Sequence, residues 1–197
     1  MQDSARGAAL AGLRVVCARP GEPLPAAYFA ARYGFLRAPL GAPLGAERLA
    51  DDSDALHVWV EAVEGGEVLA VARAHVVEGD GAAADHAGPG AARTPGFGPL
   101  GGAREGSLRS AAAATLRPAV QVRQMGVSEA HRRRGLGAAA LARLLKEAVA
   151  VWGARSGWLQ AREGAVGFYA RLGWQEVDEP FTITGVGPHR SMWRSLS

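Results

Sequence analysis

The sequence predicts a single α/β (α+β) domain over residues 1–197, with a mixed central sheet flanked by helices. Strand and helix patterns alternate between residues 119 and 177, which implies at least one parallel strand pair joined by a crossover helix. Residues 56–77 contain two strand patterns around a tight turn, which predicts an antiparallel hairpin. A chain of 197 residues is long enough for one domain with a sizeable core.

The chain begins with a loose tail, which is followed by a strand over residues 13–18 that ends before Pro20. A helix is predicted over residues 26–36, because aromatic and apolar side chains recur there at helical spacing. Pro25 suits the first turn of that helix, where a missing N–H costs nothing.

The middle of the chain holds the hairpin and a long insertion. Residues 56–63 alternate as a strand does, residues 64–66 form a tight turn, and residues 67–77 are the returning strand. Residues 79–117 consist largely of Gly, Ala and Pro with no sustained periodicity, which predicts an insertion between two strands. Residues 110–116 within it are compatible with a short helical piece.

The second half resumes with a strand over residues 120–128 and a helix over residues 134–152 that carries a broad apolar face. Gly153 is expected to cap the end of this helix. The remaining predicted elements are a strand over residues 157–161, a helix over 164–172, a strand over 174–177 and a final strand over 189–194.

Composition and charge exclude several classes of protein. A formal charge of +3 favours small anionic ligands but gives no strong nucleic-acid signal. The single cysteine, Cys17, cannot form an internal disulfide and fits a reducing compartment. The five histidines and this cysteine show no metal-ligand spacing, so no metal is expected. No apolar run approaches the ~20 residues of a membrane helix, and residues 1–13 make a poor signal peptide, so a cytoplasmic location is expected.

The most informative segment is the strand over residues 120–128 followed by Arg132-x-x-Gly135-x-Gly137 and a helix. Unpaired N–H groups at a helix start, the helix dipole and the arginines favour a phosphate at residues 132–138. A Walker loop is excluded because no lysine follows such a glycine pair. A dinucleotide site is disfavoured because Ala140 stands where its third glycine belongs. Coenzyme A remains, with its pyrophosphate at the helix start and its pantetheine arm along the strand edge.

Three ordered segments resemble the GNAT superfamily of acyl-CoA-dependent N-acetyltransferases, and the resemblance covers about residues 13–77 and 119–193. The segments are Val122-Arg-Gln-Met-Gly-Val127 with Arg132-Arg-Arg-Gly-Leu-Gly137, then Leu159-Gln-Ala-Arg-Glu-Gly-Ala-Val-Gly-Phe-Tyr-Ala-Arg-Leu-Gly-Trp174, and Phe181-Thr-Ile-Thr-Gly-Val-Gly-Pro-His189-Arg-Ser-Met192. Together with Tyr33-Gly-Phe-Leu-Arg37 and Asp54-Ala-Leu-His57, the last segment is similar to a bacterial branch of ElaA-like proteins.

The resemblance implies a splayed parallel strand pair that forms a CoA cleft, and an enzyme that moves an acetyl group from acetyl-CoA to an amine. The amine would attack the thioester directly, through a tetrahedral oxyanion. Tyr169 matches the family's general acid, which would protonate the departing thiolate. The implied cofactor contacts are Met125, Val127, Arg132, Arg133, Arg134, Gly135, Leu136, Gly137, Ala138, Gly164 and Phe168.

Several points stay open at the level of sequence. Gly164 stands where the family often has an Asn that contacts pantetheine. His57 and His189 are the candidate bases, but water could also carry the proton. The acceptor is an unidentified amine of a small molecule or peptide, and a homodimer is compatible with the sequence. The alternatives are a non-catalytic acyl-CoA-binding sensor and a nucleic-acid binder, and the second lacks an aromatic stacking platform.

Overall fold

The computed structural model describes residues 11–77, 116–177 and 179–196. The N-terminal tail over residues 1–10 and nearly all of the predicted insertion over residues 79–117, with its helical piece, lie outside the described residues.

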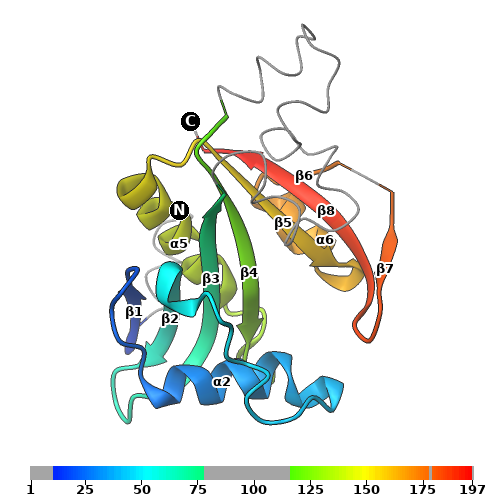
Figure 1. Cartoon of the computed structure of the whole chain (residues 1–197). Coiled ribbons are helices and arrows are strands. Elements are labelled where there is room, and N and C mark those ends of the chain that lie inside the picture. The colour runs from blue at the N-terminus through cyan, green and yellow to red at the C-terminus, as the bar shows by residue number, and fades with distance from the viewer. Residues whose placement is uncertain (1–10, 78–115, 178, 197) are drawn as a thin grey trace, which may run out of the picture. The chain divides into compact units, whose positions relative to one another are not determined.

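Figure 1 shows the strands and helices of the described residues. The strands are β1 (Leu13–Ala18), β2 (Leu56–Ala62), β3 (Val68–Val77), β4 (Ala119–Val127), β5 (Ser156–Arg162), β6 (Gln175–Glu176), β7 (Phe181–Ile183) and β8 (Gly187–Ser195). The α-helices are α2 (Ala26–Leu36), α5 (Leu136–Trp152) and α6 (Val166–Arg171). Short 3-10 helices are η1 (Ala38–Leu40), η2 (Asp52–Asp54), η4 (Glu129–His131) and η5 (Glu163–Ala165).

The sheet is mixed, as the sequence predicted. Its strands follow the order β1-β2-β3-β4-β5-β8-β6, and β7 pairs with β8. β1, β2 and β3 are antiparallel. β4 and β5 are parallel, with a register from Ala119↔Ser156 to Val122↔Leu159, and α5 is the crossover helix between them. This order confirms both the predicted hairpin and the predicted parallel pair.

The chain groups into two compact units, which are described in turn. Unit 1 is drawn from residues 1–74 and 123–147, and unit 2 from residues 75–122 and 148–197. The boundaries fall within β3, β4 and α5, so each of these elements contributes residues to both units. No α-helix in the described part of the chain is long and apolar enough to cross a membrane.

In unit 1, helices cover both faces of β1. Val16 and Ala18 pack with Tyr28 of α2. Cys17, which lies between them in the chain, lies near Glu147 of α5; burial and this carboxylate raise the pKa of the Cys17 thiol to about 11. Because successive side chains of a strand point to opposite faces, α2 and α5 cover opposite faces of the strand.

The two helices explain why β2 is buried on both faces rather than on one. Its polar side chains at His57 and Glu61 are buried along with the apolar ones. The Glu61 carboxylate accepts a hydrogen bond from Trp59 Nε1 at 2.5 Å and one from Arg14 Nε at 2.9 Å. Polar groups are tolerated in this position because they have partners.

Gly126 of β4 lets α2 approach the sheet closely. A Cβ at position 126 would lie 2.9 Å from Phe35 Cβ and 3.0 Å from Leu36 Cδ2. Real Cβ atoms do not approach other heavy atoms so closely, and one of the contacts is with a Cβ that cannot move independently of the helix. Glycine is therefore required here by packing.

In unit 2, β5 pairs with the long antiparallel strand β8, and the pair carries the core residues Trp158, Leu159 and Met192. β8 runs over Gly187–Ser195, longer than the predicted strand over residues 189–194. It also forms a hairpin with β7 that the sequence did not indicate. A strand of three residues is too short to show an alternating pattern.

Candidate functional site

The turn between β4 and α5 presents backbone N–H groups at the start of a 17-residue helix. Arg133 and Gly135 have positive φ angles of 62° and 83°, which bend the chain into the helix; glycine adopts such angles without steric cost. The Ala139 N–H donates to the Gly135 carbonyl at 2.9 Å. The N–H groups of residues 136–138 therefore precede the helical ladder and have no acceptor within it.

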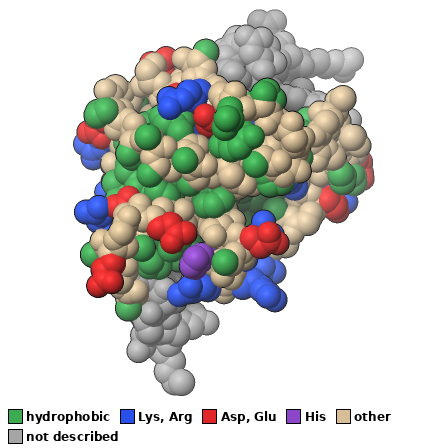
Figure 2. Space-filling model, turned by 90° about the horizontal axis from the view of Figure 1, so that it is seen from below, with side chains coloured by type: hydrophobic (Ala, Val, Ile, Leu, Met, Phe, Trp, Pro, Cys, Tyr) green, Lys and Arg blue, Asp and Glu red, His purple; other side chains and the backbone are tan. Residues whose placement is uncertain are grey.

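The side chains of this turn add positive charge. Residues 132–134 are three exposed arginines, and Arg132 Nη1 lies 3.6 Å from the Glu129 carboxylate. Ser128 Oγ and His131 Nδ1 are 3.2 Å apart and close the base of the turn, a contact that the sequence did not indicate. Figure 2, which views the molecule from below, shows both basic and acidic side chains around a histidine on that face.

The end of β4 directs one backbone donor away from β3. The Ser128 N–H donates to the Leu69 carbonyl of β3 at 2.9 Å. Since the N–H groups of successive strand residues point to opposite edges, the Val127 N–H points to the other edge of β4. That orientation suits the predicted role of Val127.

A break in the regular strand precedes Val127. Gln124 has a φ of 51°, unusual for a residue other than glycine, and its Oε1 accepts a hydrogen bond from Arg37 Nη2 at 2.9 Å. This feature was missed by sequence reasoning because no glycine marks the position. The Arg37–Gln124 hydrogen bond joins this position to the residue that follows α2.

Tyr169 on α6 is buried among aromatic rings. Its ring centroid lies 5.0 Å from that of Phe168 and 6.1 Å from that of Trp174, both in edge-on geometry. Burial raises the pKa of Tyr169, so the hydroxyl keeps its proton throughout the neutral range. Protonation is the state that a general acid requires.

Gly164 lies in η5, which leads into the helix of Tyr169. A Cβ at this position would meet no heavy atom within 4 Å. The backbone there therefore has room for the Asn side chain that the family often carries.

His57 is held on both ring nitrogens. Its Nδ1 is 3.0 Å from the Tyr28 hydroxyl, and its Nε2 is 2.8 Å from the Asp52 carbonyl. The carbonyl can only accept, so Nε2 carries the hydrogen and Nδ1 accepts from the tyrosine. Burial, reinforced by the Arg73 charge, lowers the pKa of His57 to about 4. The one N–H and the one acceptor nitrogen of the neutral ring are both engaged, which favours a structural role over that of a base.

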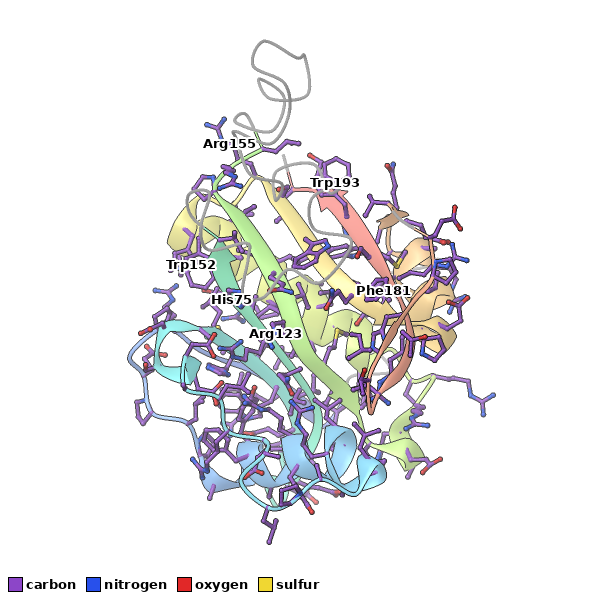
Figure 3. The ribbon with its side chains drawn as sticks, turned by 45° about the vertical axis from the view of Figure 1, so that its right-hand side comes forward. His75, Arg123, Trp152, Arg155, Phe181 and Trp193 are labelled. Atoms are coloured by element: carbon purple, nitrogen blue, oxygen red, sulfur yellow. The ribbon has the colours of Figure 1, made fainter. Side chains whose placement is uncertain are left out.

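His189 on β8 uses only one of its two ring nitrogens in a hydrogen bond to the described residues. Its Nδ1 donates to the Gly187 carbonyl at 2.8 Å, which leaves Nε2 as the unprotonated nitrogen of the neutral ring. The ring lies against Phe181 of β7, with centroids 6.3 Å apart and planes 30° apart. Figure 3 shows Phe181 on this hairpin. Of the two predicted bases, His189 therefore has a ring nitrogen that makes no hydrogen bond to the described residues, whereas His57 does not.

The predicted site residues fall into two groups. Met125, Val127 and residues 132–138 belong to unit 1, on one continuous stretch of strand, turn and helix. Gly164, Phe168, Tyr169 and His189 belong to unit 2. Among the residues that the structure describes, no cluster of His, Cys, Asp and Glu is arranged to hold a metal ion.

Comparison with known proteins agrees with this geometry. The sequence profile of the acetyltransferase (GNAT) family matches residues 28–174. A Bacillus subtilis (strain 168) protein, the uncharacterized N-acetyltransferase YitI, is 36% identical over 78 residues, which are 40% of this chain and 52% of the relative. The chain thus matches about half the length of that relative.

Two solved structures share the fold. E. coli ElaA superposes with a TM-score of 0.60 at 20% identity, over 92% of this chain and 99% of that protein. An acyl-CoA N-acyltransferase from Pseudomonas aeruginosa also has a TM-score of 0.60, at 19% identity and with the same coverage of both chains. At these identities the likeness shows the arrangement of strands and helices.

Proposed function

Because this chain belongs to the acetyltransferase (GNAT) family, we propose that it transfers an acetyl group from acetyl-CoA to an amine of a small molecule or peptide. The β4–α5 turn carries the proposal. Three N–H groups at residues 136–138 precede the helical ladder, beside the exposed arginines of residues 132–134. A pyrophosphate matches that set, because it accepts hydrogen bonds and is stabilised by the positive end of the helix.

Along β4, the backbone at Met125 and Val127 would bind the pantetheine arm. The Val127 N–H, directed away from β3, would donate to the thioester carbonyl and stabilise the oxyanion that forms on attack. In this step the acceptor nitrogen forms a bond to the carbonyl carbon. Collapse of the tetrahedral intermediate then breaks the C–S bond.

Two protons must move during the reaction. The amine loses one, to His189 Nε2 or to water, and the departing thiolate gains one from the Tyr169 hydroxyl. Tyr169 is proposed for this step because it matches the family's general acid, and its hydroxyl is protonated at neutral pH. The Tyr169 phenolate then takes up a proton, and His189, where it accepted the amine proton, releases one to solvent, which returns the protein to its starting state.

The proposed pyrophosphate site in the β4–α5 turn is tested by comparing the binding of acetyl-CoA with that of acetyl-pantetheine, which lacks the pyrophosphate and nucleotide. We expect the wild-type protein to bind acetyl-CoA more tightly than acetyl-pantetheine. In Gly135→Val, whose side chain strains a φ of 83°, we expect the affinity for acetyl-CoA to fall by at least about tenfold and the affinity for acetyl-pantetheine to stay the same. Gly41→Val, at a φ of 66° in a turn after η1, is the matched control. Equal affinity of the wild-type protein for the two ligands would refute the pyrophosphate site in the β4–α5 turn.

The alternative of a non-catalytic sensor is separated from the enzyme by turnover. A sensor would bind acetyl-CoA as the wild-type protein does but would release no thiol with any amine offered. The departure at Gly164 favours a sensor, whereas the match of Tyr169 to the family's general acid favours an enzyme.

A further inference from the structure

The last residues of α2 lie against β4 immediately before Val127. A Cβ at Gly126 would lie 2.9 Å from Phe35 Cβ and 3.0 Å from Leu36 Cδ2, so the helix and the strand are in contact there. Figure 1 shows α2 beside the arrowhead end of β4. Arg37, the C-cap residue of α2, follows directly in the chain. The backbone donor that we assign to the oxyanion therefore lies next to the end of this helix.

Arg37 connects three parts of unit 1. Its Nη2 donates to Gln124 Oε1 of β4 at 2.9 Å, and its Nε donates to the Ala46 carbonyl at 3.0 Å. Its own backbone carbonyl accepts a hydrogen bond from the Ala42 N–H at 3.2 Å. A guanidinium that donates from two of its nitrogens is held in one orientation, because its donors form a planar, rigid fork. The end of α2, the segment over residues 38–47 and β4 are thus linked through one residue.

Gln124 is the residue at which β4 departs from regular strand geometry. Its φ of 51° lies in the left-handed region, which is unfavourable for a residue that carries a Cβ. Backbone conformations of this kind persist where surrounding contacts hold them. The hydrogen bond from Arg37 is such a contact, since Arg37 is itself held by the Ala46 carbonyl and by the helix. Because Val127 follows on the same strand, the conformation at residue 124 influences the direction of its N–H.

We propose that Arg37 is a positioning residue for the oxyanion donor: by holding Gln124 at a positive φ, it directs the Val127 N–H towards the thioester carbonyl. The inference rests on the proposed function, which assigns that donor to Val127. A donor stabilises an oxyanion only where it is aimed at the position at which the charge develops, and a displacement of about 1 Å can lower a rate by on the order of a hundredfold. Arg37 should therefore affect kcat much more than the binding of acetyl-CoA.

A matched pair of substitutions at residue 124 tests the importance of the positive φ. Gln124→Ala and Gln124→Gly both remove the amide that Arg37 binds, but only glycine adopts a φ of 51° without steric cost. We expect Gln124→Ala to lower kcat by about tenfold or more, and Gln124→Gly to retain most of the wild-type kcat. The Kd of acetyl-CoA, measured by calorimetric titration, should change little in either variant. Equal kcat values in the two variants would overturn the proposal.

Variants of Arg37 assign the effect to its side chain. Arg37→Met removes the guanidinium, and we expect kcat to fall by about tenfold or more. The same substitution in the Gln124→Gly background should have little further effect, since glycine no longer has to be held at a positive φ. Arg48→Met is the matched control: it removes a guanidinium that lies 3.8 Å from the Phe29 ring centroid, and it should leave kcat unchanged. Equal losses from Arg37→Met in the two backgrounds would show that Arg37 acts through another contact and would overturn the positioning role.

A spectroscopic measurement separates this proposal from the proposed function. Acetyl-CoA with an isotopic label at the thioester carbonyl is bound in the absence of an amine, and its carbonyl stretching band is followed by infrared difference spectroscopy. We expect the wild-type protein to move the band to lower wavenumber, Arg37→Met to move it less, and Arg37→Met with Gln124→Gly to restore the wild-type position. Absence of thiol release with every amine would refute the enzyme but leave this measurement informative. The same band position in the wild-type protein and in Arg37→Met would refute the positioning role, even in an active enzyme.

Discussion

At the scale of single residues, Tyr169 has the clearest chemical assignment. Tyr169→Phe removes only the hydroxyl and keeps the ring packed against Phe168 and Trp174. We expect kcat to fall by on the order of a hundredfold or more, since the thiolate would leave without a proton donor, and the affinity for acetyl-CoA to stay the same. Steady-state kinetics and titration measure both. Tyr33→Phe, which removes a hydroxyl bound to the Ala42 carbonyl, is the control, and equal kcat values in the two variants would contradict the role.

Gly164 offers a gain-of-affinity experiment. Its backbone has room for a side chain, so Gly164→Asn should fold normally. If residue 164 faces pantetheine, the new amide supplies a hydrogen bond, and we expect CoA to bind roughly fivefold to tenfold tighter. Gly164→Ala, which adds volume without the amide, should show no gain. An unchanged Kd in both variants would place residue 164 outside the CoA site.

His57 predicts a pH dependence of stability. Its pKa is about 4 in the folded chain, below the ordinary 6.5, because the neutral ring is buried. The unfolded chain therefore binds the proton more readily between pH 6.5 and 4. The free energy of unfolding should fall by roughly 3 kcal/mol as the pH falls through this window, with no contribution above it.

Urea titrations across this pH range measure that dependence. His57→Gln lowers stability at every pH because it removes the Tyr28 and Asp52 contacts, but it should flatten the slope between pH 6.5 and 4. An identical slope in both proteins would mean that His57 does not titrate in this way.

At the scale of elements, the contact between α2 and β4 is set by Gly126. Gly126→Ala forces a methyl group against Phe35 and Leu36, and we expect a loss of about 1–3 kcal/mol in the free energy of unfolding. Gly34→Ala on α2 is the matched control, because nothing lies within 4 Å of its Cβ. A better helix former there should stabilise by about 0.5–1 kcal/mol. Equal effects in the two variants would show that the close contact is not tight.

The sequence predicted the longer elements well, because their patterns are periodic. The strand over residues 13–18, the helix over 26–36, the hairpin and the strand–helix–strand crossover are all confirmed, and Gly153 caps α5 with a hydrogen bond to the Val149 carbonyl. β7 was missed because three residues carry no period. The burial of both faces of β2 was also missed, since it depends on helices from distant parts of the chain.

The same distinction holds for the candidate site. Arg132 to Gly137 could be recognised because a strand, a glycine turn and a helix follow one another in the sequence. The turn at Gln124 and the engagement of both His57 nitrogens could not, because they depend on Arg37 and Tyr28, which are distant in sequence from the residues they contact, and on the backbone carbonyl of Asp52, which no side-chain pattern marks. Contacts of this kind become visible only in the folded chain.

At the scale of the whole molecule, the central claim is that an acetyl group moves directly from acetyl-CoA to an amine. The most direct test measures free CoA thiol and N-acetylated amine in one reaction, by thiol titration and mass spectrometry. We expect the two products in equal amounts, both dependent on the amine and both formed more slowly, to the same extent, in Tyr169→Phe. Thiol release without N-acetylated amine would show a thioester hydrolase, and acetyl-CoA binding with neither product would show a sensor; either result would contradict the account.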